Sequence, residues 1–315
     1  MPVAISKPAC IAIKNILVAT DFSRLSNRAL DYALSFARRY DSTVIATHVI
    51  SPALYATPST AAMYGGMDPL PYLDNVRREL THRLNDLAIE VEEAGVICIP
   101  KLVEGDIGEQ LRVMAEEADT DLIVIGTRGE ERWERLVMGS VAESVAHSAQ
   151  CPVLTVGPRV FRRPKLEASL KHIIYATDFS SDSAHAAPYA ISLAEEFNAK
   201  ITLVHVLPPE LRTYEDQRTL LRYFHEQLQK LMPAQAQPWC EPEFILEFGG
   251  SSEAIVNLAE ERAADLIVLG TRKSSSALTY FKSGVAYKVM CHAECPVFTV
   301  TGEKEYRGSR AAEQN

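Results

Sequence analysis

The chain has 315 residues and a formal net charge of −9, with 32 Lys and Arg against 41 Asp and Glu. This acidic balance argues against nucleic acid or an anionic membrane as a general partner, because both are bound through basic patches. No apolar run approaches the roughly 20 residues of a membrane-spanning helix, the start lacks a cleavage pattern, and the six cysteines include no C-x-x-C pair. We therefore expect a cytoplasmic protein, without membrane contact, whose thiols are reduced.

The first half of the chain reads as strands that alternate with helices. Apolar runs predict strands near residues 15–20, 43–50, 96–103, 121–126 and 152–157. After the first strand, the spacing of one helix face recurs at Ala29, Ala33, Phe36, Ala37 and Tyr40. An Arg- and Glu-rich stretch over 72–95 predicts a longer helix, and Asp106 with Glu109 has the spacing of an N-cap box. This alternation predicts right-handed crossovers and a mostly parallel, doubly wound α/β sheet.

A glycine-punctuated loop follows the fourth predicted strand. Gly126, Gly129 and Gly139, with Ser140 behind them, form the pattern G-x2-G-x9-G-S, and Val141 opens a helical spacing. Glycine permits close backbone approach, and the unpaired N–H groups at a helix start form a seat for an anion. The sequence therefore predicts a phosphate site built from backbone amides rather than from overall charge.

The second half of the chain repeats the first. KNILVATDFS over 14–23 returns as KHIIYATDFS over 171–180, an offset of 157 (178 − 21), and DLIVIGTR over 121–128 returns over 265–272 as DLIVLGTR, an offset of 144 (265 − 121). The first copy thus carries 13 extra residues (157 − 144), in or around 51–74, which could form a lid, a contact surface or an ordinary loop. Strands are expected near 172–177, 200–207, 242–248, 265–270 and 296–301. We predict one domain over 1–158, a linker, a second domain over 170–302 and a flexible tail over 303–315.

These motifs resemble the universal stress protein family, twice over: the two A-T-D-F-S turns, the glycine loop, and the C-P-V strands that begin at Cys151 and Cys295. The resemblance implies two tandem five-stranded, Rossmann-like sheets of the adenine nucleotide alpha hydrolase-like type, each in strand order 3-2-1-4-5. It further implies a regulatory stress-response module that binds ATP, with or without Mg²⁺. In this order the first and fourth strands are neighbours at the switch point, so Asp21 and the glycine loop would face one crevice.

The resemblance also implies particular nucleotide contacts in the first domain. Asp21 and the backbone of Ala19 would border the nucleoside, and Val44 would meet the adenine through its main chain. The phosphates would be held by Gly126, Thr127, Arg128, Gly129, Gly139, Ser140 and Val141. The residues themselves support the phosphate part alone, and Asp21 could instead be a carboxylate at the start of the following helix.

The second copy departs from the loop pattern. Lys273 replaces the second glycine, and the final Gly-Ser is transposed to Ser283-Gly284. We therefore expect the nucleotide in the first domain and a degenerate partner in the second. The last strands, 153–156 and 297–300, are short and apolar, which predicts that the two domains pair through them as an intramolecular pseudo-dimer, with a homodimer as a further option.

Three classes of function stay open. An ATP-binding regulatory module leads, a slow ATP hydrolase is the second, and a nucleotide-independent dimerisation scaffold is the third. The chain lacks the G-x4-G-K-[ST] lysine and a recognisable catalytic triad, which weighs against an enzyme. Glu130, Glu131 and Glu134 crowd the glycine loop and would repel a triphosphate unless they face solvent or hold a divalent ion. His48 and His205 are expected to be packed or hydrogen-bonded rather than catalytic.

Overall fold

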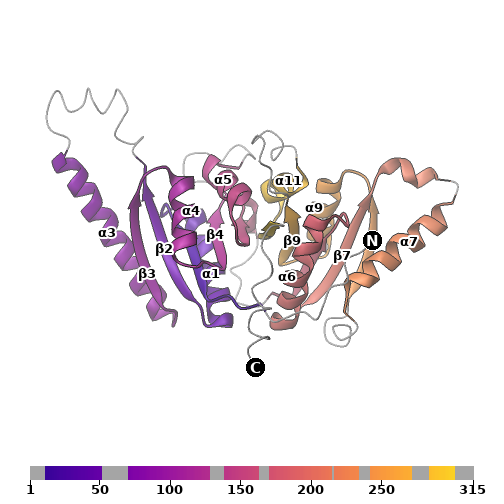
Figure 1. Cartoon of the computed structure of the whole chain (residues 1–315), viewed down its shortest axis with the longest axis horizontal. Coiled ribbons are helices and arrows are strands. Elements are labelled where there is room, and N and C mark those ends of the chain that lie inside the picture. The colour runs from indigo at the N-terminus through magenta and orange to yellow at the C-terminus, as the bar shows by residue number, and fades with distance from the viewer. Residues whose placement is uncertain are drawn as a thin grey trace, which may run out of the picture.

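The computed structural model describes residues 11–51, 70–127, 138–162, 170–214, 216–233, 242–271 and 284–301. In these residues, ten strands form one continuous sheet in the order β3-β2-β1-β4-β5-β10-β9-β6-β7-β8 (Figure 1). The strands are β1 (Asn15–Ala19), β2 (Thr43–Ile50), β3 (Cys98–Glu104), β4 (Leu122–Gly126), β5 (Val153–Val156), β6 (His172–Ala176), β7 (Lys200–Leu207), β8 (Glu243–Phe248), β9 (Leu266–Thr271) and β10 (Val297–Thr301). Each half has the predicted order 3-2-1-4-5, and its neighbouring strands run parallel.

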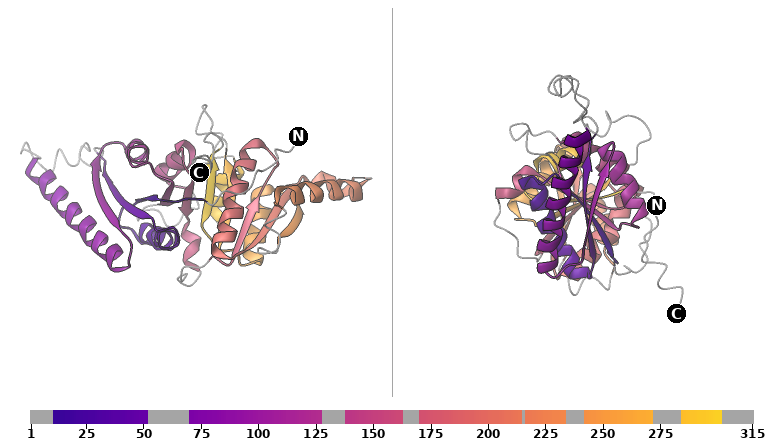
Figure 2. Two further views of the ribbon diagram at one scale, coloured as in Figure 1. Left: turned by 60° about the horizontal axis from the view of Figure 1, so that its bottom comes forward. Right: turned by 90° about the vertical axis from the view of Figure 1, so that its left-hand side faces the viewer.

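Helices cover both faces of this sheet (Figure 2). They are α1 (Arg24–Tyr40), α3 (Leu70–Glu93), α4 (Ile107–Glu117), α5 (Ser140–Ser148), α6 (Ser181–Phe197), α7 (Gln217–Leu231), α9 (Ser251–Glu261) and α11 (Val285–His292). One face packs on α1, α3, α6 and α7, and the other packs on α4, α5, α9 and α11. The central strands are apolar on both faces because both are covered, which is why they read as continuous hydrophobic runs.

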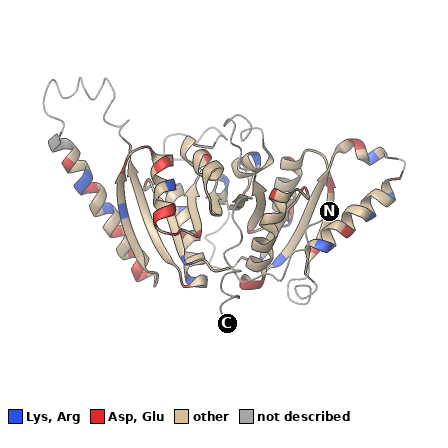
Figure 3. Ribbon diagram, in the orientation of Figure 1, with Lys and Arg blue, Asp and Glu red and all other residues tan. Residues whose placement is uncertain are grey.

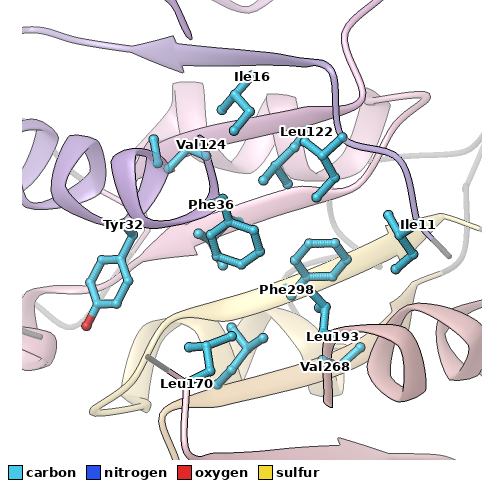
Figure 4. Packing of buried hydrophobic residues seen from close by; sticks show 14 of the residues in the cluster. Ile11, Ile16, Tyr32, Phe36, Leu122, Val124, Leu170, Leu193, Val268 and Phe298 are labelled. Carbon is cyan, nitrogen blue, oxygen red and sulfur yellow. The ribbon is translucent and has the colours of Figure 1, made fainter. Parts of the chain in front are cut away.

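The two halves share their hydrophobic cores. Each face of the sheet has one cluster of buried side chains that contains residues of both domains. Figure 4 shows Phe36 of α1 beside Phe298 of β10, with Leu193 of α6 next to them. The ring of Phe36 also meets the ring of Phe197 edge to face, at 5.6 Å between centroids. The domains are therefore packed against each other through an apolar interface as well as through the sheet.

Strands β5 and β10 join the halves, as the apolar final strands predicted. They pair antiparallel, with Phe298 opposite Leu154. The flanking threonines repeat one contact from either side: the Thr155 hydroxyl donates to the carbonyl of Val297 and the Thr299 hydroxyl donates to the carbonyl of Val153, both at 3.2 Å. This reciprocal pattern is that of a two-fold axis through the Leu154–Phe298 pair, so the predicted pseudo-dimer is confirmed.

Charged residues of both signs are mixed along the outer helices α3 and α7 (Figure 3). At the helix pair that crosses the domain boundary, Arg39 of α1 lies 3.4 Å from Glu196 of α6. The two residues are equivalent in the two copies, since 196 − 39 is again 157. Among the helices that the structure describes, none is long and apolar enough to cross a bilayer.

The predicted elements correspond to observed ones with shifted ends. The helix expected over 72–95 is α3, and Asp106 caps α4 by accepting a hydrogen bond from the Glu109 amide. A 3-10 helix, η2 (Pro158–Arg162), lies where the expected linker begins. Most of the 51–74 insertion, the loop glutamates and the tail lie outside the described residues.

Candidate functional site

The turn after β1 is held by its own side chains. The Thr20 hydroxyl accepts from the amide of Phe22, and the Asp21 carboxylate accepts from the amide of Ser23, both at 3.0 Å. Phe22 adopts a left-handed backbone, with φ of 62°, which is uncommon for a bulky residue and marks a constrained position. Ser23 then caps α1 by accepting from the amide of Ser26. The turn therefore presents the exposed Asp21 carboxylate at the carboxyl end of β1.

The end of β2 lies beside this turn and carries His48. Its Nδ1 is 2.8 Å from the carbonyl oxygen of Thr20. A carbonyl only accepts, so Nδ1 carries the proton and Nε2 is left as an acceptor. Burial lowers the pKa of His48 and outweighs the hydrogen bond to Thr20, which raises it. The imidazole is therefore a neutral ring, stacked on Phe22 at 5.1 Å between centroids.

The glycine loop begins and ends at one place. Gly126 is the last residue of β4, and a Cβ there would come within 3.1 Å of Leu25 in the first turn of α1. The amide of Gly139 donates to the carbonyl of Thr127 at 2.7 Å, which brings the two ends of the loop together. Gly139 is the N-cap of α5 and has no side chain to cap it. The first N–H groups of α5, from Ser140 onward, are thus available to an anion.

These pieces enclose a cavity of about 520 Å³ at the carboxyl ends of β1, β2 and β4. That volume is in the range of small-molecule sites. The lining residues are Ala19, Thr20, Asp21, Ser26, Thr47, His48, Val49, Ile50, Ser51, Val76, Leu80, Ile107, Leu111, Ile125, Gly126, Thr127, Gly139, Ser140, Val141 and Ala142. One end is the polar start of α5, and the other is apolar, between α3 and α4.

Two buried hydroxyls in this cavity lack partners. Oγ1 of Thr47 and Oγ1 of Thr127 are shielded from solvent and have no hydrogen-bond partner among the described residues. Each threonine is 1% exposed, and each lines the cavity. Leaving a buried hydroxyl unpaired is costly, and such groups in native structures usually have a partner. A polar ligand in the cavity would supply one.

Most of the predicted site residues meet in this cavity, with one correction. Ala19, Asp21, Gly126 and Thr127 line it, and so do Gly139, Ser140 and Val141; Arg128 and Gly129 lie outside the described residues.

Val44 was misplaced, because it opens β2 at the amino end, is fully buried and pairs with Cys98. The cavity instead meets β2 at Thr47 to Ile50. The general rule that ligands lie beyond the carboxyl ends of strands would have pointed there.

The second domain repeats the turn but has a smaller cavity. The Nδ1 of His205 is 2.8 Å from the carbonyl oxygen of Thr177, and Phe179 has φ of 61°. Burial alone would raise the pKa of Asp178, yet hydrogen bonds from Ser180 and Ser183 outweigh it and lower the pKa. The equivalent cavity measures about 220 Å³, below the usual size of small-molecule sites.

Fold and site together define a protein built from two tandem Rossmann-like α/β domains, the first with a cavity of ligand size. Known proteins agree: the model of the universal stress protein family matches residues 12–157 and again 169–301. The chain belongs to the universal stress protein family.

Individual relatives match one domain or both. The universal stress protein MJ0531 of Methanocaldococcus jannaschii is 31% identical over 154 residues, which are 49% of this chain and 85% of that protein. The crystal structure of a universal stress protein from Archaeoglobus fulgidus shares the fold over 91% of this chain and 98% of its own, with a TM-score of 0.70 and 22% identity. The tandem arrangement is therefore found in a solved structure as well.

Proposed function

We propose that this universal stress protein is a regulatory module that binds ATP in its first domain. The observation that carries the proposal is the 520 Å³ cavity, which joins the uncapped start of α5 to the turn after β1. The α5 amides would hold phosphate oxygens, since the end of a helix dipole there favours negative charge. The Ser140 hydroxyl and the unpaired Oγ1 of Thr127 would add two hydrogen bonds to the same part of the ligand.

The remaining part of the cavity suits a nucleoside. Asp21, on the turn, is an acceptor for sugar hydroxyls, and Val49 with Ile50 supplies an apolar wall at the end of β2. A universal stress protein that is 22% identical over 43% of this chain has been solved in complex with cAMP, with a TM-score of 0.36. Because that likeness is distant, the proposal rests on the cavity of this chain and on its unpaired hydroxyls.

The test is calorimetric titration of the full chain with ATP, together with identification of any nucleotide that co-purifies. We expect one site per chain. Gly139→Val should abolish binding because it places a branched side chain at the proposed phosphate seat. The matched control is Gly284→Val, since Gly284 is the N-cap of the equivalent helix α11. This control should bind ATP as the wild type does.

Two results would overturn the proposal. One is a pair of equal sites per chain, and the other is full ATP affinity in Gly139→Val. Phosphate release measured on the same samples distinguishes a regulatory ATP-binding module from an ATP hydrolase. Turnover near about 1 per second, an ordinary enzyme rate, that disappears in Asp21→Ala would make the protein an ATP hydrolase instead.

A further inference from the structure

The two outer helices, α3 and α7, are equivalent at an offset of 144. Leu84 of α3 and Leu228 of α7 are 1% and 0% exposed, and Leu87 and Leu231, one turn further, are each 8% exposed. The matching burial fixes the register between the helices. One turn before Leu84, the same offset places Phe224 of the second domain at the position of Leu80.

In the second domain, Phe224 packs on His205, near the carboxyl end of β7. The rings of His205 and Phe224 are stacked, with centroids 4.9 Å apart and planes at 25°. Phe224 also lies 6.0 Å from the ring of Phe179, which itself lies 4.6 Å from His205. The three rings form one cluster beside the second cavity, whose lining includes His205 but neither Phe179 nor Phe224.

In the first domain, the equivalent residue of the outer helix is the smaller Leu80. His48 hydrogen-bonds to the carbonyl oxygen of Thr20, as His205 does to that of Thr177, and Leu80 lines the same cavity as His48. His48, Leu80 and Val76 line the apolar end of the larger cavity. The guanidinium of Arg83 covers Phe22 at 4.2 Å from the ring centroid. Leu80, at the position of Phe224, therefore lines the ligand cavity in the first domain.

We propose that His48 is the stacking platform for a planar aromatic ring of the ligand, and that Phe224 is the built-in occupant of the same subsite in the second domain. This names the base-recognising residue of the proposed nucleotide site, and so rests on that proposed function for the identity of the ring. The ring sits over the imidazole of His48, against Leu80 and Val76.

The chemistry of His48 fits this role. Its Nδ1–H is engaged by Thr20, which fixes the plane of the ring, and the ring is stacked on Phe22. Stacking on an aromatic side chain is tolerant of the identity of the base, because each base has a π-face. The subsite therefore selects for a flat ring, and discrimination among bases must come from hydrogen bonds elsewhere in the cavity.

Reciprocal substitutions test the proposal. Leu80→Phe places a second-domain residue in the first domain and should weaken binding of ATP and of adenosine by roughly 10- to 100-fold, the usual size of a lost base-stacking contact. It should leave binding of inorganic tripolyphosphate unchanged. Phe224→Leu is the matched control and should leave first-domain affinity for ATP as it is. Melting temperatures of both variants show that each is folded.

A second measurement keeps this test separate from the proposed function. Adding adenosine to the wild-type chain should move the NMR signals of the His48 ring protons, by ring current, with assignment from a His48→Phe variant that keeps a ring. If ATP fails to bind through its phosphates but adenosine still moves His48, the proposed function fails and the stacking subsite stands. Unchanged His48 signals at saturating adenosine, or wild-type adenosine affinity in Leu80→Phe, would overturn the stacking subsite.

Discussion

The joint between the two domains can be tested at Phe298. This side chain is 0% exposed and lies opposite Leu154 at the centre of the β5–β10 pairing. Its ring packs on Tyr189 of α6 at 5.8 Å, and it belongs to the cluster that contains Phe36. Truncation of a buried phenylalanine to alanine removes these contacts and leaves a cavity. Phe298→Ala should therefore lower the free energy of unfolding by about 3–5 kcal/mol.

The expected shift can be read by calorimetry and by urea unfolding. At about 2–4 °C per kcal/mol for chains of this order of size, the melting temperature should fall by roughly 6–20 °C. Because Phe298 lies at the joint between the two domains, we also expect unfolding to split into two transitions, as is common when domains lose their mutual support. A matched variant is available, because Leu154 and Phe298 are equivalent residues that face each other.

Exchanging the two side chains tests whether the packed volume at the joint, rather than the identity of the residue at each position, sets the stability. Leu154→Phe alone overpacks the joint and should cost about 1–3 kcal/mol. Leu154→Phe combined with Phe298→Leu restores the total volume and should cost under about 1.5 kcal/mol. The reasoning is refuted if Phe298→Ala costs less than about 1 kcal/mol, or if the exchange costs as much as the sum of Leu154→Phe and Phe298→Leu measured singly.

Two further predictions concern titratable groups. Burial lowers the pKa of both His48 and His205 from 6.5, so the folded chain binds fewer protons than the unfolded chain. The contribution of these two histidines to the free energy of unfolding is therefore complete above about pH 6.5 and is lost as the pH drops through the folded pKa values. The melting temperature should decline below pH 6.5, and less steeply in a His48→Gln, His205→Gln variant; an identical decline in both proteins would contradict this. Burial raises the pKa of the Cys98 thiol to about 11, so iodoacetamide at pH 8 should label this thiol in urea but not in the native protein. Peptide mass spectrometry measures the labelling. Rapid labelling of the native protein would contradict the prediction.

The sequence predicted the fold closely for a physical reason. Strands buried on both faces must be apolar throughout, and the repeat allowed each one to be seen twice, so that a run such as 121–126 is recognised again at 265–270. The ends of elements depend on caps and on neighbouring segments, which is why the helix expected over 72–95 is observed as α3 (Leu70–Glu93). Order along the sheet followed from the family resemblance rather than from the residues themselves.

The site was predictable where backbone chemistry defines it. Glycines and a helix start identify a phosphate seat, and Gly126, Gly139 and Ser140 do line the cavity. The apolar wall at β2 was misassigned to Val44, although the rule that ligands lie beyond the carboxyl ends of parallel strands points to the other end of this strand, where Val49 lies. The role of Leu80 depends on a helix that packs over the end of another strand, and no local pattern in the sequence signals such a contact.

The pairing of Arg39 with Glu196 has a consequence for how the two halves could diverge. In a symmetric dimer of identical chains, a residue near the two-fold axis meets its own copy, and every substitution is made on both sides at once. Arginine at this position would face arginine. Here the two equivalent positions belong to one chain and differ, so a substitution in one half can be matched by another in its partner. Within one chain, each half is thus free of the other's sequence, so the first copy can have the larger cavity while the second carries Phe224.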